Sequence, residues 1–183
     1  MLSGMSRKNF APLMIAACLF LVSQTVVNHA SAQQAPEARS SAKDALTLTA
    51  PAHDPAQISA ADLKAMPHLT ITIHNSHSNA DETYSGVRLS DLLAKVGAPL
   101  GSELHGKALA NYIVATGSDG YKSVLALGEV DPSFHPGEVM VADAMDGKPL
   151  DAHSGPFKLV VTENKRPARS VRNLVSIELK SAQ

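Results

Sequence analysis

The sequence contains a single cysteine, Cys18, in a chain of 183 residues. Cys18 falls inside the N-terminal signal sequence described in the next paragraph, so we expect the mature protein to contain no cysteine. A protein without cysteine forms no disulfide bond, has no catalytic thiol and offers no thiolate to a metal ion. This absence excludes several classes of enzyme and metal site.

The apolar stretch at residues 11–22 is short for a transmembrane helix, which needs about 20 residues. It follows Arg7 and Lys8 and precedes the small residues at 30–32, an order typical of a secretory signal peptide. We predict a signal peptide over residues 1–32, cleavage after Ala32, and a periplasmic or secreted protein without a transmembrane span. A lipoprotein signal at Cys18 is the alternative, because residues 15–18 resemble a lipobox.

The chain has no excess of positive charge. Its formal net charge is −1, and loss of Arg7 and Lys8 with the signal makes the mature chain more acidic. Proteins that bind nucleic acids usually carry a basic surface, often with aromatic residues, so we expect no nucleic-acid partner. The sequence also lacks a G-x-S-x-G nucleophile motif, a glycine-rich phosphate motif and an internal repeat.

Residues 33–44 are polar and contain proline, which predicts a flexible leader before one domain at 45–183. Within that domain the strands do not alternate regularly with helices, so the predicted fold class is α+β, a mixed β-sheet with short helices. Ser59 is the predicted N-cap of the first helix. Strands are expected at 45–50, 68–75, 83–87, 108–116, 121–127 and 138–143 and twice within 155–180, and short helices at 58–67, 89–97 and 129–134.

His74 and His77 are a candidate metal pair, but their spacing argues against chelation. Residues three apart on a strand point to opposite faces, so a chelate would require the strand to end and turn at Asn75. Structural zinc sites use four ligands and catalytic sites usually three, and no third ligand has a recognisable spacing. We predict no metal site and interpret both residues as solvated or hydrogen-bonded loop histidines.

A basic cluster, Lys165, Arg166, Arg169 and Arg172, connects the last two predicted strands. If residues 166–171 form a helical turn, Arg166 and Arg169 share a face and Arg172 continues it. Guanidinium groups with free backbone N–H groups at a turn make a site for an anion, especially phosphate. A solvated basic patch that balances acidic residues elsewhere is an equally weighted alternative.

The C-terminal part, VMVADAMDGKPLDAHSGPFKLVVTENKRPARSVRNLVSIEL, resembles the molybdopterin-binding oxidoreductase domain of sulfite oxidases and of periplasmic methionine-sulfoxide reductase catalytic subunits. The upstream segments YSGVRLSDLLAKVGAPL and ATGSDGY match further family segments in the same order. The resemblance covers roughly residues 45–180. It implies a sulfite-oxidase-type molybdopterin-binding fold, molybdopterin as the cofactor, and a redox or periplasmic protein partner.

The resemblance also implies site residues. The family holds the pterin phosphate and pyran ring with its basic element, a polar residue before the G-x-P loop and a basic residue early in the next strand. The family's molybdenum-ligand cysteine would fall near His74 or Asn75, neither of which supplies a thiolate, and no catalytic residue is assigned. The implied cofactor-binding residues are His153, Lys158, Arg169, Ser170, Val171 and Arg172.

Three functional interpretations follow. The first is a ligand- or partner-binding module with the sulfite-oxidase fold and without cysteine-ligated molybdenum chemistry. The second is a molybdopterin-dependent oxidoreductase subunit with atypical metal ligation, and the third is a structural relic whose basic turn is only surface. Bound molybdenum separates the second from the others. Loss of binding on replacing Arg169 and Arg172 separates the first from the third.

Overall fold

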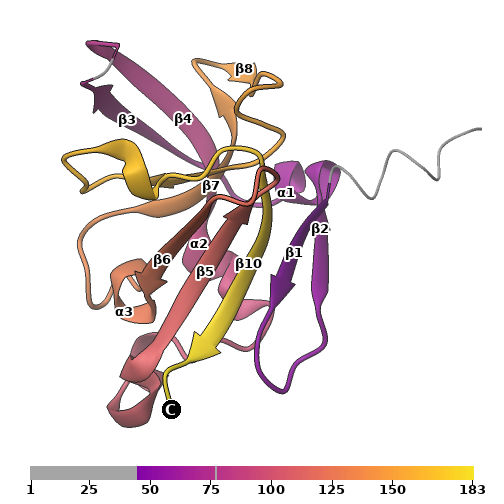
Figure 1. The fold of residues 1–183 in the computed structure, drawn as a ribbon, viewed down its shortest axis with the longest axis vertical. Helices are drawn as coiled ribbons and strands as arrows, with labels where there is room; N and C mark the ends of the chain where they lie inside the picture. Colours follow the sequence, from indigo (N-terminus) through magenta and orange to yellow (C-terminus); the bar gives the residue numbers. More distant parts are fainter. Residues whose placement is uncertain (1–44, 77) are drawn as a thin grey trace, which may run out of the picture. The chain divides into compact units, whose positions relative to one another are not determined.

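The computed structural model describes residues 45–76 and 78–183. The predicted signal peptide, its cleavage site, the leader and His77 lie outside the described residues. Within them the chain forms two five-stranded β-sheets with short helices (Figure 1). The predicted α+β class with mixed sheets is therefore confirmed.

The first sheet has the strand order β2-β1-β10-β5-β6. β1 runs parallel to β10, and every other neighbouring pair in this sheet is antiparallel. The first described strand and the C-terminal strand therefore lie side by side. The members of this sheet are β1 (Ala45–Thr49), β2 (Ala56–Ser59), β5 (Asn111–Gly117), β6 (Lys122–Ala126) and β10 (Leu174–Ser181).

The second sheet is built around β7, which pairs with β4 on one side and with β9 and β8 on the other. β3 pairs with β4 in an antiparallel hairpin and forms the edge of this sheet. The members are β3 (Leu69–Asn75), β4 (Ala80–Arg88), β7 (Val139–Met145), β8 (Lys148–Pro149) and β9 (Lys158–Val161).

Both sheets contribute to one main hydrophobic core. Successive side chains of a strand lie on opposite faces, so alternate residues enter this core. Helix α2 (Leu89–Ala94) adds its apolar side to the same core. Among the buried residues are Leu46, Leu48, Ile113, Leu125 and Ile177 from the first sheet, Val87, Val141, Leu159 and Val161 from the second, and Leu89, Leu92 and Leu93 from α2.

The opposite face of the second sheet carries a smaller apolar cluster. Its buried members are Tyr84, Met140, Ala142 and Val160, which alternate with the core-facing residues of the same strands. Five further apolar side chains, which are only partly buried, pack around it: Leu69, Ile71, Ile73, Met145 and Leu150. This face is the floor of the cavity described in the next subsection.

The first short helix begins where its predicted N-cap places it. Ser59 caps α1 (Ala60–Ala65): its hydroxyl accepts a hydrogen bond from the Asp62 N–H at 3.1 Å, and the Asp62 carboxylate accepts one from the Ser59 N–H at 3.0 Å. This reciprocal pair is a capping box. The other helical segments are α3 (Leu127–Val130) and the 3-10 turns Gly101–Glu103, Gly106–Ala110 and Pro167–Arg169. In the described part, no helix is long and apolar enough to cross a membrane.

Several sequence-based boundaries were wrong. The helix expected at 129–134 is α3, Leu127–Val130, and the helix expected at 89–97 ends at Ala94. Residues 56–59 form β2, although Ile58 had been assigned to the first helix; Ile58 pairs with Leu46 and is buried. β4 starts at Ala80, earlier than the predicted 83, because it pairs with β3 as far as Asn75. β5 starts at Asn111, because residues 106–110 form a 3-10 turn.

The last two strands do not pair with each other as elements of one sheet. β9 belongs to the second sheet and β10 to the first. Residues 162–173, which we call the basic segment, therefore run from one sheet to the other (Figure 1).

Candidate functional site

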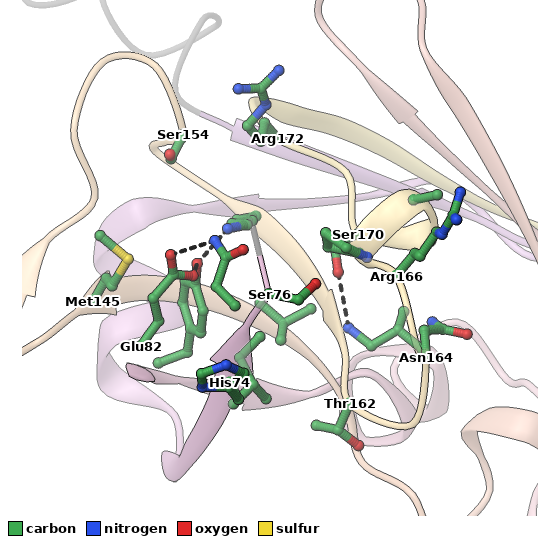
Figure 2. A pocket seen from close by; sticks show the side chains of 18 of the residues that line it. His74, Ser76, Glu82, Met145, Ser154, Thr162, Asn164, Arg166, Ser170 and Arg172 are labelled. Carbon is green, nitrogen blue, oxygen red and sulfur yellow. Dashed lines mark hydrogen bonds between the residues drawn. The ribbon is translucent and has the colours of Figure 1, made fainter. Parts of the chain in front are cut away.

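The outer face of the second sheet and the basic segment enclose a cavity of about 1030 Å³, which we call the site cavity. Its floor includes Tyr84, Lys158 and Val160. Residues 72–76, at the end of β3, border it on one side, and residues 162–168 border it on another (Figure 2). The cavity thus joins an apolar sheet face to a polar, charged wall.

The wall carries cationic side chains without acidic partners. Lys165, Arg166 and Arg172 all line the cavity, and none of them forms an ion pair with a carboxylate among residues 45–76 and 78–183. Arg172 donates instead to Nε2 of His153. Guanidinium groups without a carboxylate partner retain N–H donors for the phosphate or carboxylate of a ligand.

A chain of hydrogen bonds crosses the floor, and we call it the floor network. Lys158 Nζ donates to the Tyr84 hydroxyl, which itself donates to Glu82 Oε2 at 2.7 Å. Asn75 Nδ2 donates to Glu82 Oε1 at 2.6 Å. Lys158 Nζ also lies 4.3 Å from the centre of the Tyr84 ring, within cation–π range. The floor network therefore links β3, β4 and β9.

The surroundings of the floor network shift two pKa values in opposite directions. Burial lowers the pKa of Lys158; the Glu82 carboxylate opposes this shift and Arg172 adds to it. Burial also raises the pKa of Tyr84, and its hydrogen bond to Glu82 raises it further. Tyr84 therefore keeps its proton at neutral pH and acts as the donor toward Glu82.

Four of the six residues implied by the family resemblance lie together at the site cavity: His153, Lys158, Ser170 and Arg172. Val171 is fully buried in the main core, and its backbone exchanges hydrogen bonds with Leu159. Its side chain is therefore turned away from the cavity.

Arg169 lies outside the site cavity. Its NH1 pairs with Glu129 Oε1 at 2.8 Å, and its Nε and NH2 donate to Asn164 Oδ1 at 3.1 and 2.8 Å. The predicted shared face of Arg166 and Arg169 is wrong, because the 3-10 turn spans only Pro167–Arg169. Arg166 precedes this turn in extended backbone, with φ −135° and ψ 141°. In this position Arg169 anchors the basic segment to α3.

His74 borders the cavity at the end of β3, which stops at Asn75. Alternation along β3 places the His74 side chain on the opposite face from Asn75. His74 Nδ1 is 2.8 Å from Asp81 Oδ1, so His74 is hydrogen-bonded, in agreement with the prediction for this residue. In the part of the chain that the structure describes, no group of three His, Cys, Asp or Glu residues is arranged to hold a metal ion.

Sequence reasoning did not select Glu82 and Tyr84 as site residues. They are two apart on one strand, so alternation alone predicts that they share a face. Tyr84 is 1% exposed yet carries a polar hydroxyl, and a buried hydroxyl usually has a hydrogen-bond partner. The sequence does not reveal that this face meets the basic segment, because that depends on how β9 pairs with β7.

Comparison with known proteins identifies the class. Residues 32–183 match the oxidoreductase molybdopterin binding domain family, and the chain belongs to this family. The chain is similar to a solved structure, the sulfane dehydrogenase SoxCD from Paracoccus pantotrophus, with a TM-score of 0.59 and 20% identity. That match covers 76% of this chain and 40% of the other chain, and at this identity it shows the fold. No curated protein matches the chain.

The residues of the site fit the pterin ring and the phosphate of a molybdopterin better than they fit its metal. Lys165, Arg166 and Arg172 suit a phosphate, and the Tyr84 and Val160 part of the floor suits a planar ring. The single cysteine, Cys18, precedes the matched residues 32–183, so the family region offers no thiolate. The donor set therefore fits the pterin and its phosphate but does not fit a thiolate-held metal.

Proposed function

We propose that this chain is an exported protein that binds a phosphorylated planar heterocycle of the pterin class, without cysteine-ligated molybdenum chemistry. One observation carries the proposal: Lys165, Arg166 and Arg172 line a cavity of about 1030 Å³ and have no carboxylate partner in the described residues. Cavities of this size, which combine apolar side chains with a few placed polar groups, are typical of small-molecule sites.

Each wall of the cavity has a role in this proposal. The phosphate pairs with Arg166 and Arg172 through charge-assisted hydrogen bonds, which are shorter and stronger than neutral ones. Ser170 Oγ accepts a hydrogen bond from the Val161 N–H at 3.3 Å, so its own proton can be donated to the ligand. The ring lies on the Tyr84 and Val160 side of the cavity.

Calorimetric titration with a pterin monophosphate and with inorganic phosphate tests this function. Arg166→Ala combined with Arg172→Ala is expected to weaken binding at least about tenfold, since hydrogen bonds to charged groups contribute roughly 1.5–3 kcal/mol each. Lys107→Ala is the control, because Lys107 is exposed and does not line the cavity. Unchanged affinity in the double variant would show that the basic segment is only surface.

The alternative is a molybdopterin-dependent oxidoreductase subunit with atypical metal ligation. Family membership and the fold similarity to a sulfane dehydrogenase support it. Elemental analysis for molybdenum, with an absorption spectrum, on protein purified from the exported fraction of its host separates the two. Near-stoichiometric molybdenum supports the oxidoreductase, whereas a bound pterin without molybdenum supports the binding module.

We also propose export with cleavage after Ala32, and an exported redox or other protein as partner. N-terminal sequencing of the protein from its host is expected to start at Gln33. A start at Met1 would contradict export with cleavage, and a lipid-modified N-terminal Cys18 would establish the lipoprotein alternative.

A further inference from the structure

The floor network places a carboxylate and an ammonium group within one cavity, joined through a phenol. Glu82 and Lys158 both line the site cavity, and both side chains bond to the hydroxyl of Tyr84. Figure 2 shows Glu82 and Arg166 on opposite sides of the view, so the carboxylate is set apart from this cation of the wall. A ligand whose phosphate lies at the wall therefore has its ring directed toward the floor network.

The hydrogen-bonding capacity of these two groups is only partly used. Each oxygen of Glu82 accepts one hydrogen bond, from Asn75 and from Tyr84 respectively, and a carboxylate has about four acceptor sites. Lys158 has three N–H donors, one of which points to Tyr84. An acceptor on Glu82 and a donor on Lys158 therefore remain for a ligand.

Resting on the proposed function, we propose that Glu82 and Lys158 recognise the lactam edge of the bound heterocycle, where an N–H group lies next to a C=O group. Glu82 accepts from the ring N–H, and Lys158 donates to the ring carbonyl. The cavity then takes phosphorylated lactam rings, such as pterin, guanine and hypoxanthine, and disfavours rings with the reverse pattern, such as adenine.

The reverse pattern is disfavoured for a defined reason. Adenine places a ring nitrogen lone pair and an amino group where a lactam has N–H and C=O. The lone pair would then face the Glu82 carboxylate and the amino group would face the Lys158 ammonium. Polar groups left unpaired in a site typically lower affinity by a factor of ten or more. Tyr84 cannot relieve this mismatch, because its proton is held by Glu82 at 2.7 Å.

Three nucleoside monophosphates provide matched probes, because inosine, guanosine and adenosine monophosphate share the same ribose and phosphate. Calorimetric titration of the mature protein is expected to show that the inosine and guanosine compounds bind at least about tenfold more tightly than the adenosine compound. Glu82→Ala is expected to bring this ratio close to one. Glu82→Gln, which keeps the shape of the side chain, is expected to lower it and covers the case in which Glu82→Ala fails to fold.

Arg166→Ala is the control, since it removes a phosphate contact and is expected to weaken all three nucleotides equally with the ratio unchanged. The outcomes separate the two proposals. If neither the nucleotides nor the pterin monophosphate bind, the proposed function fails. If nucleotides bind without preference, or if Glu82→Ala keeps the preference, the lactam role of Glu82 is overturned and the anion site stands.

Discussion

Lys158 sits where its own charge is disfavoured. Burial lowers its pKa, and the ammonium group contacts the hydroxyl and the ring of Tyr84 rather than a paired carboxylate. A half-buried cation without a close ion pair is only partly solvated, which reduces the stability of the folded state. Its position at the cavity floor, beside Tyr84 and Glu82, indicates a functional residue, because groups with shifted pKa values in a cleft are often found at binding sites.

Lys158→Met is therefore expected to stabilise the protein at pH 7 while weakening ligand binding. In the folded state the pKa of Lys158 lies below its ordinary value of 10.5. At a pH between the folded-state pKa and 10.5, the unfolded chain therefore binds more protons than the folded protein. The free energy of unfolding of the wild type should then rise with pH in this window, up to about pH 10, where Tyr84 begins to titrate in the unfolded chain.

Urea unfolding of the wild type and of Lys158→Met at pH 7 to 10 measures this effect. The variant should lack the rise with pH, and Lys165→Met, at an exposed residue of the same cavity, should keep it. If the free energy of unfolding changed with pH equally in the wild type and in Lys158→Met, the Lys158 charge would be well solvated in the folded protein.

At the scale of the element, the basic segment is held by side-chain contacts as well as by its two strands. Arg169 pairs with Glu129 on α3, and the Tyr121 hydroxyl donates to the Ala168 carbonyl at 2.5 Å. These contacts fix the part of the segment that carries Lys165 and Arg166. Arg169 thus acts as a positioning residue.

Arg169→Ala and Glu129→Ala are each expected to weaken phosphate binding several-fold, although neither residue lines the site cavity. The double variant should be no weaker than either single variant, because both remove the same anchor. Stability should change by less than about 1 kcal/mol, since the two side chains are 38% and 35% exposed. Calorimetry would refute the anchor role if only Arg169→Ala weakened binding, because Arg169 would then be a direct ligand.

Gly86 lies at an irregularity in the pairing of β4 with β7. A Cβ atom there would stand 2.1 Å from the Val141 carbonyl oxygen, which is backbone and cannot move aside. Gly86→Ala is expected to lower the free energy of unfolding by about 1–3 kcal/mol. Gly128→Ala on α3 is the matched control, because nothing lies within 4 Å of its Cβ and alanine favours helix. Similar unfolding midpoints for both variants would contradict this close approach.

Local signals predicted the elements that carry strong local patterns. Ser59 predicted the start of α1, and the strand expected at 68–75 is β3. β2 has only four residues and depends on pairing with β1, so its own sequence could not reveal it. The three-residue spacing of Arg166 and Arg169 suggested a shared face, but the turn was too short to produce one. Contacts such as Glu82 with Tyr84 and Lys158 depend on which strands become neighbours.

At the scale of the whole molecule, stability is concentrated between the two sheets. Leu159 is fully buried there, whereas Leu69 on the outer face is only partly buried. Leu159→Ala is expected to lower the free energy of unfolding by about 2–5 kcal/mol, and Leu69→Ala by clearly less. Chemical denaturation measures both. Equal losses would indicate that the outer face of the second sheet is covered as tightly as the main core.

The passage of the basic segment from one sheet to the other has a consequence for the lifetime of the protein. A ligand in the site cavity touches the floor on the second sheet and the segment that leads into β10 on the first. Separating the sheets would then require the ligand to leave first. A ligand at a hundred times its dissociation constant adds about 2.7 kcal/mol against unfolding. When proteases degrade the unfolded chain, the protein with bound ligand should survive longer than the empty protein, so the amount of protein would follow the supply of its ligand.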